Sequence, residues 1–476
     1  MSEIVVVGGG IGGLAASALL ARAGHETTLL EANGWLGGKS RRIEVGGQRI
    51  DTGPSLFTFP GVWKEFLKRY DTLGRDGHAS RTSNLELRRM PEVGRYFFRK
   101  DAISLPVEEG HPWREAWEKF ERIHGYFGPE VTKLLTSDPA SPATLPALAK
   151  LLRAYGTRLT TRSYLDGLSW MPDGLREIVA IHTLNAGVSP DRTPALYASM
   201  PAVMARDGVF VPDGGVYEIV LALERLARKA GVEIRTSCPV ETIEKGRVFS
   251  ANGEHRADFI VGDLDANRLE RLVEPEKKPR NGRLSCSGVA IYASLEHGGG
   301  LDLPPHSVVL PSAPDSLHAS LEAGSEPSET MAFVNYYPPG EIYPNDKPTL
   351  AFLLTAPANG KAYDLSDRFV EREISRVSEM VGLSKPATEY FGGDVVFHPK
   401  YFERGGGTGG ALYGHARPFW RSGPFHRPRY SDTSRPWLWR VGASVHPGGG
   451  IPAVLGGAIV STGRLLRKLN GNGRGR

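Results

Sequence analysis

The sequence predicts an α/β protein in which a Rossmann-like dinucleotide-binding domain is interrupted by a discontinuous α+β substrate-binding domain. Three observations predict this arrangement. A complete βαβ pattern occupies residues 4–31, further β-branched strands recur near residues 240 and 260, and a glycine-rich loop precedes the last long helix near residue 450. With 476 residues the chain is long enough for two closely packed domains with a substantial core.

The βαβ pattern begins with the β-branched run 4–7, which is typical of a buried parallel strand. Three glycines follow in a G-x-G-x-x-G pattern: Gly8, Gly10 and Gly13. The first permits a tight turn, the second lets the backbone approach a pyrophosphate, and the third lets helix 14–23 pack on the strand. Strand 27–30 then leads to Glu31, which we expect to accept a hydrogen bond from the adenosine ribose. The unit predicts a bound dinucleotide but does not decide between FAD and NAD.

A second block has the same α/β character. Gly208–Pro212 and a Gly-Gly pair lead into an amphipathic helix over 216–230 and a strand over 232–235. Strand 240–244 and a hairpin at Asn252-Gly253, expected to form a type I′ turn, return the chain to strand 259–261. The third block is the C-terminal stretch 438–469.

The remaining stretches are richer in proline, aromatic residues and loops, so we assign them to a substrate-binding domain. The expected boundaries are 1–60, 205–284 and 428–470 for the dinucleotide-binding domain, and 61–204 and 285–427 for the substrate-binding domain. Residues 471–476, rich in glycine and arginine, are expected to form a disordered tail.

Composition limits the function classes. The two cysteines, Cys238 and Cys286, lie far apart without metal-ligand spacing, so neither a disulfide scaffold nor a metal site is expected, and a cytoplasmic location fits. Glu3 stands where a signal peptide needs basic residues, and no apolar run approaches the ~20 residues of a membrane span. The net charge of +5 comes from scattered basic residues, so nucleic acid is not an expected partner.

One segment, 145–162, combines apolar residues at helical spacing with basic residues on other faces. The apolar positions are Leu145, Leu148, Leu151, Leu152, Tyr155 and Leu159. A basic amphipathic helix can lie in a membrane interface, which would place the protein at the inner face of the membrane as a peripheral protein. The alternative, a surface helix whose apolar side packs on the core, is the commoner case.

Two loops after Glu31 indicate which dinucleotide is bound. Gly37-Gly38-Lys39-Ser40 and Asp51-Thr52-Gly53-Pro54 resemble the corresponding loops of the FAD-dependent phytoene desaturase and amine oxidase superfamily. The resemblance implies that the cofactor is FAD and that Gly37, Gly38, Lys39, Gly53 and Pro54 lie along its diphosphate and ribityl chain. It also implies a glutathione reductase/amine oxidase type of fold, with Val240 on the adenine side. Lys39 replaces the commoner arginine, which keeps the charge but loses the bidentate fork.

The C-terminal block carries a second glycine-rich loop, which runs from Gly442 and Ala443 to Gly450. Ile451 follows, and Pro452 stands where the first turn of a helix to Leu469 would begin. A reduced flavin carries negative charge near N1 and the C2 carbonyl, and a helix N-terminus is a positive partner for that charge. The loop therefore predicts a redox site.

The run Val441–Pro452 resembles the V-G-A-x-x-H-P-G-x-G-I-P signature of the bacterial and fungal type phytoene desaturase family, a group of carotenoid desaturases. Weaker matches between the two ends extend the resemblance over nearly the whole chain: Asn185–Pro190, Ser285–Ser287, His398-Pro399 and Arg427-Pro428. Amine oxidases place an acid in this loop, typically after the glycine, where this chain has Ala443-Ser444.

The resemblance implies removal of two hydrogens from a C–C bond beside a conjugated polyene in an acyclic carotenoid, with FAD taking a hydride and a quinone or oxygen as the final acceptor. Such chemistry needs a dry apolar channel and an oriented flavin more than a catalytic triad. His446 is the candidate base, with a reference pKa of ~6.5. Its alternative role is structural, with the ring hydrogen-bonded to the loop backbone.

The run Asp51–Pro60 and the short chain resemble the group that acts late in the pathway, by 3,4-desaturation of 1-hydroxy carotenoids. A phytoene desaturase acting earlier is the first alternative. A flavin amine oxidase shares the N-terminal block, but the His446–Pro452 loop argues against it. A non-redox prenyl-binding escort protein of the GDP dissociation inhibitor type shares the fold, yet has no need for an intact pyrophosphate loop with its ribose acid.

Overall fold

The computed structural model describes residues 1–476 apart from 75–82, 84, 280–281, 297–300 and 473–476. Its first sheet has five parallel strands in the order β19-β13-β1-β2-β9. Their bounds are β1 Glu3–Val7, β2 Glu26–Leu30, β9 Glu233–Arg235, β13 Phe259–Gly262 and β19 Leu438–Arg440. Strands from three distant stretches of the chain thus form one parallel sheet, as a discontinuous Rossmann-like domain requires.

Both faces of the first sheet are covered, which explains the β-branched run at its centre. Ile4 and Val6 pack into a core with α1 (Ile11–Arg22), whereas Val5 and Val7 pack against the opposite core. That second core lies under a three-stranded antiparallel sheet: β10 Val240–Glu244, β11 Arg247–Ser250 and β12 Gly253–Arg256. Helices α9 (Glu218–Lys229) and α14 (Ile451–Asn472) lie beside α1 on the first face.

The second domain contains a seven-stranded, mainly antiparallel sheet in the order β18-β14-β17-β16-β15-β6-β7. Its bounds are β6 Gly94–Phe98, β7 Asp101–Leu105, β14 Ser287–Leu295, β15 His306–Val309, β16 Ala332–Tyr337, β17 Thr349–Ala356 and β18 Phe391–Phe397. Strand β15 pairs with β6 in parallel, so the stretches before and after the middle block of the first domain share this sheet. Two shorter pairs accompany it: β3 Arg41–Val45 with β4 Gln48–Thr52, and β5 Leu87–Arg89 with β8 Phe210–Pro212.

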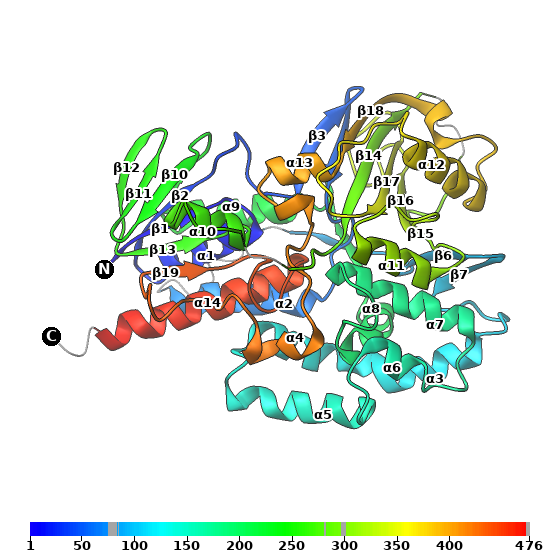
Figure 1. Cartoon of the computed structure of the whole chain (residues 1–476), viewed down its shortest axis with the longest axis horizontal. Helices are drawn as coiled ribbons and strands as arrows, with labels where there is room; N and C mark the ends of the chain where they lie inside the picture. Colours follow the sequence, from blue (N-terminus) through cyan, green and yellow to red (C-terminus); the bar gives the residue numbers. More distant parts are fainter. Residues whose placement is uncertain (75–82, 84, 280–281, 297–300, 473–476) are drawn as a thin grey trace.

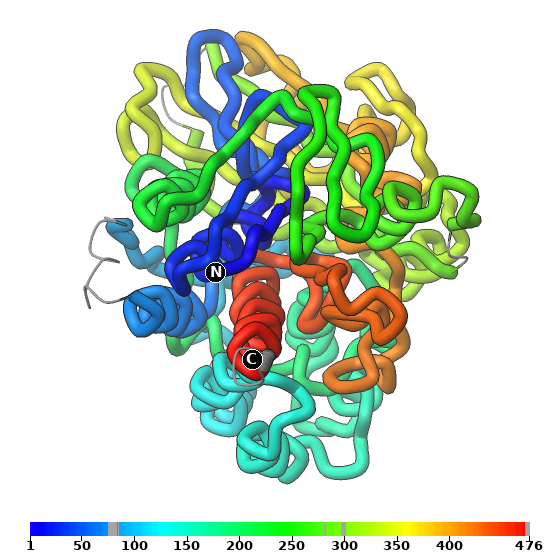
Figure 2. Tube along the Cα trace, turned by 90° about the vertical axis from the view of Figure 1, so that its left-hand side faces the viewer, coloured from blue at the N-terminus to red at the C-terminus, as the bar shows by residue number. Residues whose placement is uncertain are grey.

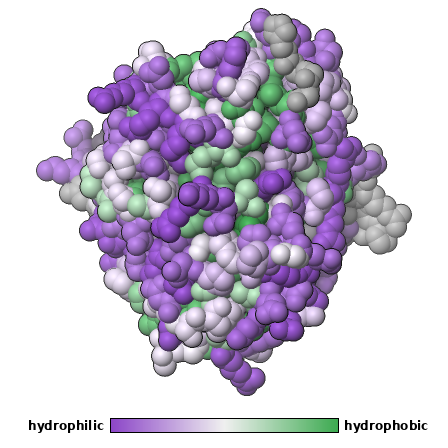
Figure 3. Space-filling view, turned by 90° about the vertical axis from the view of Figure 1, so that its right-hand side faces the viewer, coloured by the Kyte–Doolittle hydropathy of each residue, from purple (hydrophilic) through white to green (hydrophobic). Residues whose placement is uncertain are grey.

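Helices complete the second domain. Below the large sheet in Figure 1 lie α3 Arg114–His124, α4 Gly128–Thr136, α5 Leu145–Tyr155, α6 Thr161–Leu165, α7 Asp173–Ala180 and α8 Met200–Asp207. The others are α2 Pro60–Leu73, α11 Pro314–Ala323, α12 Arg368–Met380 and α13 Pro399–Arg404. Helix α10 (Ala266–Val273) belongs to the first domain, because its Leu269 lies in the same core as Val5 and Val7. Polar residues cover most of the face shown in Figure 3, with apolar patches between them.

Helix α14 joins the two domains. It contacts α1 on one side and α2 and α4 on the other, and Figure 2 shows it end-on between the N-terminal segment and the cyan helices. A Cβ on Gly456 would lie 2.2 Å from the Leu135 carbonyl oxygen, so α4 packs directly on the α14 backbone. Within the described part of the chain, no helix combines the length and apolar character needed to span a bilayer.

Three local expectations need correction. The hairpin turn lies at Ala251-Asn252, with Gly253 opening β12, and neither turn residue has the positive φ of a type I′ turn. Helix α14 continues through Asn472, two residues into the expected disordered tail 471–476, and the tail's last four residues lie outside the described part. The amphipathic segment 145–162 is not one helix, because Gly156, at φ +60°, ends α5.

Candidate functional site

The N-terminus of α1 lies at the carboxyl end of β1, where doubly wound sheets bind nucleotides. Gly8 has a φ of +103° and its N–H donates to the Leu30 carbonyl at 2.8 Å. A Cβ on Gly13 would lie 2.0 Å from the Gly8 carbonyl oxygen, so only glycine lets α1 pack this close to the loop. Gly10 is the N-cap of α1 and provides no side-chain hydrogen bond to the free N–H groups of the first turn.

Glu31 is buried directly after β2 and closes the first glycine loop. Its Oε2 accepts the Gly9 N–H at 2.7 Å, and Oε1 accepts the backbone and side-chain N–H groups of Asn33 at 2.8 and 2.6 Å. An ionised carboxylate offers about four acceptor sites, so capacity remains for a ribose hydroxyl. Val240 opens β10 two residues after Cys238, whose N–H donates to the Glu31 carbonyl at 2.8 Å.

The Gly37–Ser40 loop lies against the first glycine loop. The Gly37 N–H donates to the Gly9 carbonyl at 2.8 Å, and a Cβ on Gly38 would lie 3.4 Å from the Gly10 Cα. The Lys39 ammonium donates to the Leu412 carbonyl and interacts with two nearby acids, Asp263 and Asp265. The positive charge of Lys39 suits a phosphate ligand, and in this structure the two acidic side chains interact with it.

The Gly53-Pro54 turn packs on the same loop. A Cβ on Gly53 would lie 2.5 Å from the Lys39 carbonyl oxygen, and the Gly53 N–H donates to the Tyr292 hydroxyl at 2.9 Å. Ser40 has a buried hydroxyl for which the described part of the chain provides no hydrogen-bond partner. Such an orphaned polar atom costs free energy unless a ligand or water satisfies it.

The second glycine loop begins in contact with the first. A Cβ on Gly12 would lie 2.9 Å from the Gly442 nitrogen, so the chain after β19 touches the first turn of α1. Ala443 follows, half-buried, where amine oxidases carry an acid. Gly450 precedes α14 with φ +87°, Ile451 is buried, and Pro452 occupies the first turn. The two halves of the predicted site therefore lie side by side.

The His446 ring contacts α4. Its ring bonds to the backbone of Leu134 in α4, and its Nε2 is buried with no hydrogen-bond partner among the described residues. Burial lowers the pKa of His446 to about 4, with Arg464 and Arg417 adding to the effect. The lowered pKa favours the neutral ring at pH 7, and the hydrogen bond to Leu134 connects the loop to α4.

Sequence reasoning missed Asp263, which follows β13 and lies between the two glycine loops. Its Oδ2 accepts the Gly13 N–H at 2.7 Å, and its Oδ1 would lie 2.1 Å from a Cβ on Gly442. Burial raises the pKa of Asp263 to about 6, with Glu31 adding to the shift. Its position after a predicted strand could have identified it, because the residue that follows a strand paired in parallel with β1 lies at the nucleotide-binding edge of the sheet.

Tyr413 was also missed, and it connects the second domain to the second glycine loop. A Cβ on Gly449 would lie 2.2 Å from its ring, and one on Gly187 would lie 2.7 Å from the other edge. The Cys286 N–H donates to the Gly187 carbonyl at 2.8 Å, and the Cys286 carbonyl accepts the Leu412 N–H at 3.0 Å. The weak middle motifs around residues 187 and 286 therefore meet beside the second glycine loop.

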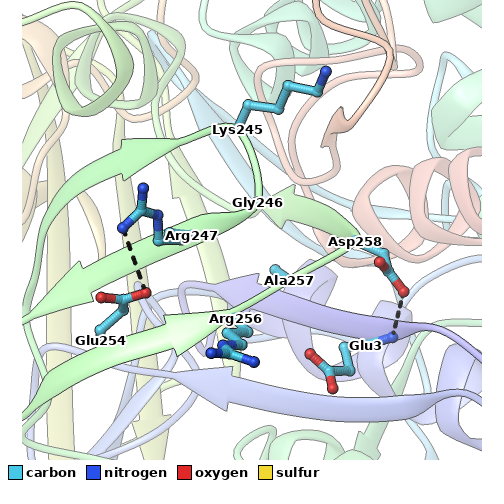
Figure 4. A pocket seen from close by; sticks show the side chains of 8 residues that line it. All are labelled: Glu3, Lys245, Gly246, Arg247, Glu254, Arg256, Ala257 and Asp258. Atoms are coloured by element: carbon cyan, nitrogen blue, oxygen red, sulfur yellow. Dashed lines mark hydrogen bonds and ion pairs between the residues drawn. The ribbon is translucent and has the colours of Figure 1, made fainter.

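A charged surface hollow lies elsewhere, between Glu3 of β1 and the β10–β12 sheet (Figure 4). Arg247 pairs with Glu254 at 3.8 Å across it, and Asp258 accepts the Glu3 N–H at 3.1 Å. This hollow faces the amino end of β1, opposite the nucleotide-binding edge. We assign it no role in the candidate site.

Comparison with known proteins supports this reading of the fold. Residues 6–70 match a family described as an NAD(P)-binding Rossmann-like domain. The chain is 24% identical to a 4,4'-diapophytoene desaturase (4,4'-diaponeurosporene-forming) of Staphylococcus aureus, over 98% of this chain and 99% of that protein.

Solved structures of similar fold include a putrescine oxidase triple mutant, with a TM-score of 0.64 at 14% identity and 99% coverage of both chains. Cyclohexylamine oxidase from Brevibacterium oxydans IH-35A has a TM-score of 0.61 at 13% identity, over 98% of this chain and 99% of that one. The prediction of a Rossmann-like fold of the amine oxidase type is confirmed.

Proposed function

We propose that this chain is an FAD-dependent oxidoreductase acting on CH–CH bonds, a carotenoid desaturase. The observation that carries the proposal is the contact between the two glycine loops at Gly12 and Gly442, which places the start of the second loop beside the N-terminus of α1. The full-length similarity to a bacterial desaturase supports the same class of reaction. Bound FAD would accept a hydride from the substrate.

The residues present fit FAD. The positions proposed to hold it are Gly8, Gly10, Gly13, Glu31, Gly37, Gly38, Lys39, Gly53, Pro54, Val240, Gly442, Ala443, Gly450, Ile451 and Pro452. Two features of the chain support the fit without reference to any relative. The Ser40 hydroxyl is orphaned among the described residues, and no atom lies within 4 Å of a Cβ placed on Gly448 or Gly450, so this surface is open to a ligand.

The protein's own contribution is binding, orientation and charge. Helix α14 directs its free N–H groups toward the loop Gly448–Gly450, where negative charge on a reduced ring would be stabilised. His446 as base remains part of the proposal, and His446→Ala tests it. If His446 is the base, the variant should lose turnover and retain FAD; if its ring only holds the loop against Leu134, turnover should remain measurable.

The alternatives fit less well. The second loop has Ala443 in place of the amine oxidase acid, and amine oxidase neighbours at 13–14% identity share the fold alone. A non-redox escort protein would not need the close packing of Gly13 on Gly8 or the buried acid Glu31. Purified protein that stays colourless after FAD is added would favour the escort protein.

The finer proposal is 3,4-desaturation of a 1-hydroxy acyclic carotenoid, with phytoene desaturation as the alternative. The run Asp51–Pro60 supports it by resemblance. The decisive experiment expresses the chain in cells that accumulate phytoene, 4,4'-diapophytoene or a 1-hydroxy carotenoid and records which pigment shifts to longer wavelength. A shift with either unhydroxylated substrate alone would overturn the late-step assignment. Adding a quinone or oxygen to the reduced protein then identifies the acceptor.

Peripheral contact with an anionic membrane is part of the proposal, and α5 supports it. Ala147, Leu151 and Tyr155 are buried, whereas the outer face exposes large apolar side chains. The exposed fractions are 59% for Leu145, 43% for Leu148, 48% for Leu152 and 53% for Leu159 just beyond the helix. Lys150 and Arg153 are exposed on the same helix, so the surface combines apolar and basic groups as an interfacial helix does.

Vesicle co-sedimentation tests this surface. We expect the wild type to bind vesicles that contain anionic lipid, and Leu148→Asp with Leu152→Asp to reduce binding about tenfold, because each leucine buries apolar area worth about 1 kcal/mol or more in the interface. Ser375→Asp, on the exposed side of α12, controls for added negative charge. Equal binding by the double variant and wild type would exclude α5 as the contact.

A further inference from the structure

Asp263 occupies the position at which a dinucleotide phosphate would meet α1. Its carboxylate accepts the Gly13 N–H at 2.7 Å, and Oδ2 would lie 2.5 Å from a Cβ on Gly10. Its Oδ1 would lie 2.7 Å from a Cβ on Gly12 and 2.1 Å from one on Gly442. The three glycines thus form a cradle whose nearest polar group is a carboxylate belonging to the protein itself.

An acid is an unexpected neighbour for a diphosphate. The free N–H groups of a helix N-terminus attract anions, and an ionised carboxylate there competes for the same donors and repels the phosphate charge. When protonated, the same side chain is neutral and can donate a hydrogen bond to a phosphate oxygen. The charge on Asp263 therefore decides whether this group opposes or assists the cofactor.

Charged groups from the neighbouring elements set that balance. Glu31, after β2, adds negative charge, and Lys39, from the Gly37–Ser40 loop, adds the opposing positive charge. Asp265, two residues along the chain, also interacts with Lys39. The titratable residue of the second glycine loop, His446, turns instead to Leu134. Burial and Glu31 thus favour the protonated form of Asp263, whereas the Gly13 N–H and Lys39 favour its ionised form.

We propose that Asp263 is a proton-linked positioning residue for the dinucleotide, such that the chain binds FAD more tightly when this carboxyl group is protonated. The inference rests on the proposed function, because it requires FAD to occupy the α1 N-terminus. Burial already holds the pKa of Asp263 near 6 in the protein alone, and a bound diphosphate would raise the pKa further. FAD affinity consequently falls as the pH rises from about 6 to 8.

Flavin titration of the apoprotein tests the proposal by fluorescence quenching between pH 5.5 and 8.5. We expect the wild-type dissociation constant to rise about tenfold over this range, a change of roughly 1.4 kcal/mol. Asp263→Asn keeps an acceptor for the Gly13 N–H and removes the charge, so its affinity should be nearly independent of pH and higher than wild type at pH 8. Asp263→Ser is a second uncharged variant. Asp258→Asn, which removes a carboxylate at the opposite end of the first sheet and keeps an acceptor for the Glu3 N–H, is the matched control and should retain the pH dependence.

Melting temperatures of the apoproteins give a readout without flavin. Folding raises the pKa of Asp263 from 3.8 to about 6, so the melting temperature of Asp263→Asn should differ little from wild type near pH 4, rise above it between pH 4 and 6, and keep that advantage at pH 8. Identical pH dependence of flavin affinity in wild type and both Asp263 variants would overturn the inference while leaving FAD binding intact. Absence of flavin binding by wild type and variants at every pH would overturn the proposed function and the inference with it.

Discussion

The two glycine loops look alike in sequence, but different structural features require their glycines. In the first loop the protein's own atoms fill the space, because a Cβ on Gly13 would lie 2.0 Å from the Gly8 carbonyl oxygen. In the second loop, Gly448 and Gly450 have positive φ and no atom within 4 Å of a Cβ. Close packing explains the spacing of the first pattern, whereas positive φ values explain Gly448 and Gly450 at the open end of the second.

The difference separates two functions. The first loop builds the βαβ unit and is needed before any cofactor arrives, so changes there affect stability and binding together. Gly448 and Gly450 of the second loop have open space beside them next to the N-terminus of α14, so we expect changes at these two positions to affect binding more than folding. Asp263 links the two, since it contacts Gly13 in the first and Gly442 in the second.

The largest effect is expected from Gly13→Ala. The added methyl group meets backbone rather than a flexible side chain, so α1 must move away from β1. We expect a loss of about 3 kcal/mol in the free energy of unfolding, at the upper end of overpacking costs, and loss of flavin binding. Urea denaturation and flavin titration measure both quantities.

Gly463→Ala supplies the matched control for that substitution. Gly463 lies inside α14, and a Cβ added there would have Arg467 Nη1 as its nearest neighbour, 3.9 Å away, so alanine should stabilise the protein by roughly 0.5–1 kcal/mol. If Gly13→Ala were no more destabilising than Gly463→Ala, the close packing of the first loop would not constrain the fold.

Much of the first loop was predictable from sequence and much of its surroundings was not. Gly8, Gly10, Gly13 and Glu31 lie where local spacing puts them, because one βαβ unit places all four. Asp263 lies at this edge only because β13 pairs with β1, a contact between residues about 255 positions apart that no local pattern reveals. The orientation of α5 was equally hidden, since Leu151 and Leu152 are both apolar and only one of them is buried.

A pH effect of intermediate size should distinguish His446, in the second loop, from Asp263. The two residues change the free energy of unfolding in opposite directions as the pH changes. His446 in the second loop has its pKa lowered from 6.5 to about 4, so the folded state binds fewer protons than the unfolded state in this window and stability falls as the pH drops from 6.5 toward 4. Asp263 has its pKa raised, so its contribution falls as the pH rises from 3.8 through about 6.

His446→Gln checks that sign. We expect the variant to recover about 2 kcal/mol relative to wild type when pH 5 is compared with pH 7, because glutamine does not titrate. Thermal or urea unfolding of both proteins at both pH values measures the free energy of unfolding. Comparing the pH 5 and pH 7 values of each protein removes any effect of the substitution on packing that does not depend on pH. Other buried histidines, including His426 and His182, keep a residual acid sensitivity in both proteins. A variant that tracks wild type at both pH values would show that His446 is not held neutral by burial.

The smallest change in stability is expected from Gly450→Ala, and it bears most directly on the difference between the loops. The residue has φ +87°, so alanine costs about 1 kcal/mol in backbone strain, but the added methyl group meets no atom of the protein. If the open side of the loop receives the flavin, the same methyl group obstructs it, and flavin affinity should fall by more than the strain accounts for, about tenfold or greater.

Gly423→Ala, at φ +60° and also without neighbours within 4 Å, carries comparable strain outside the candidate site and should leave flavin affinity unchanged. Equal flavin affinity in the two variants would mean that the open glycines of the second loop serve its backbone conformation alone, and the cofactor would then have to be sought on another side of α14.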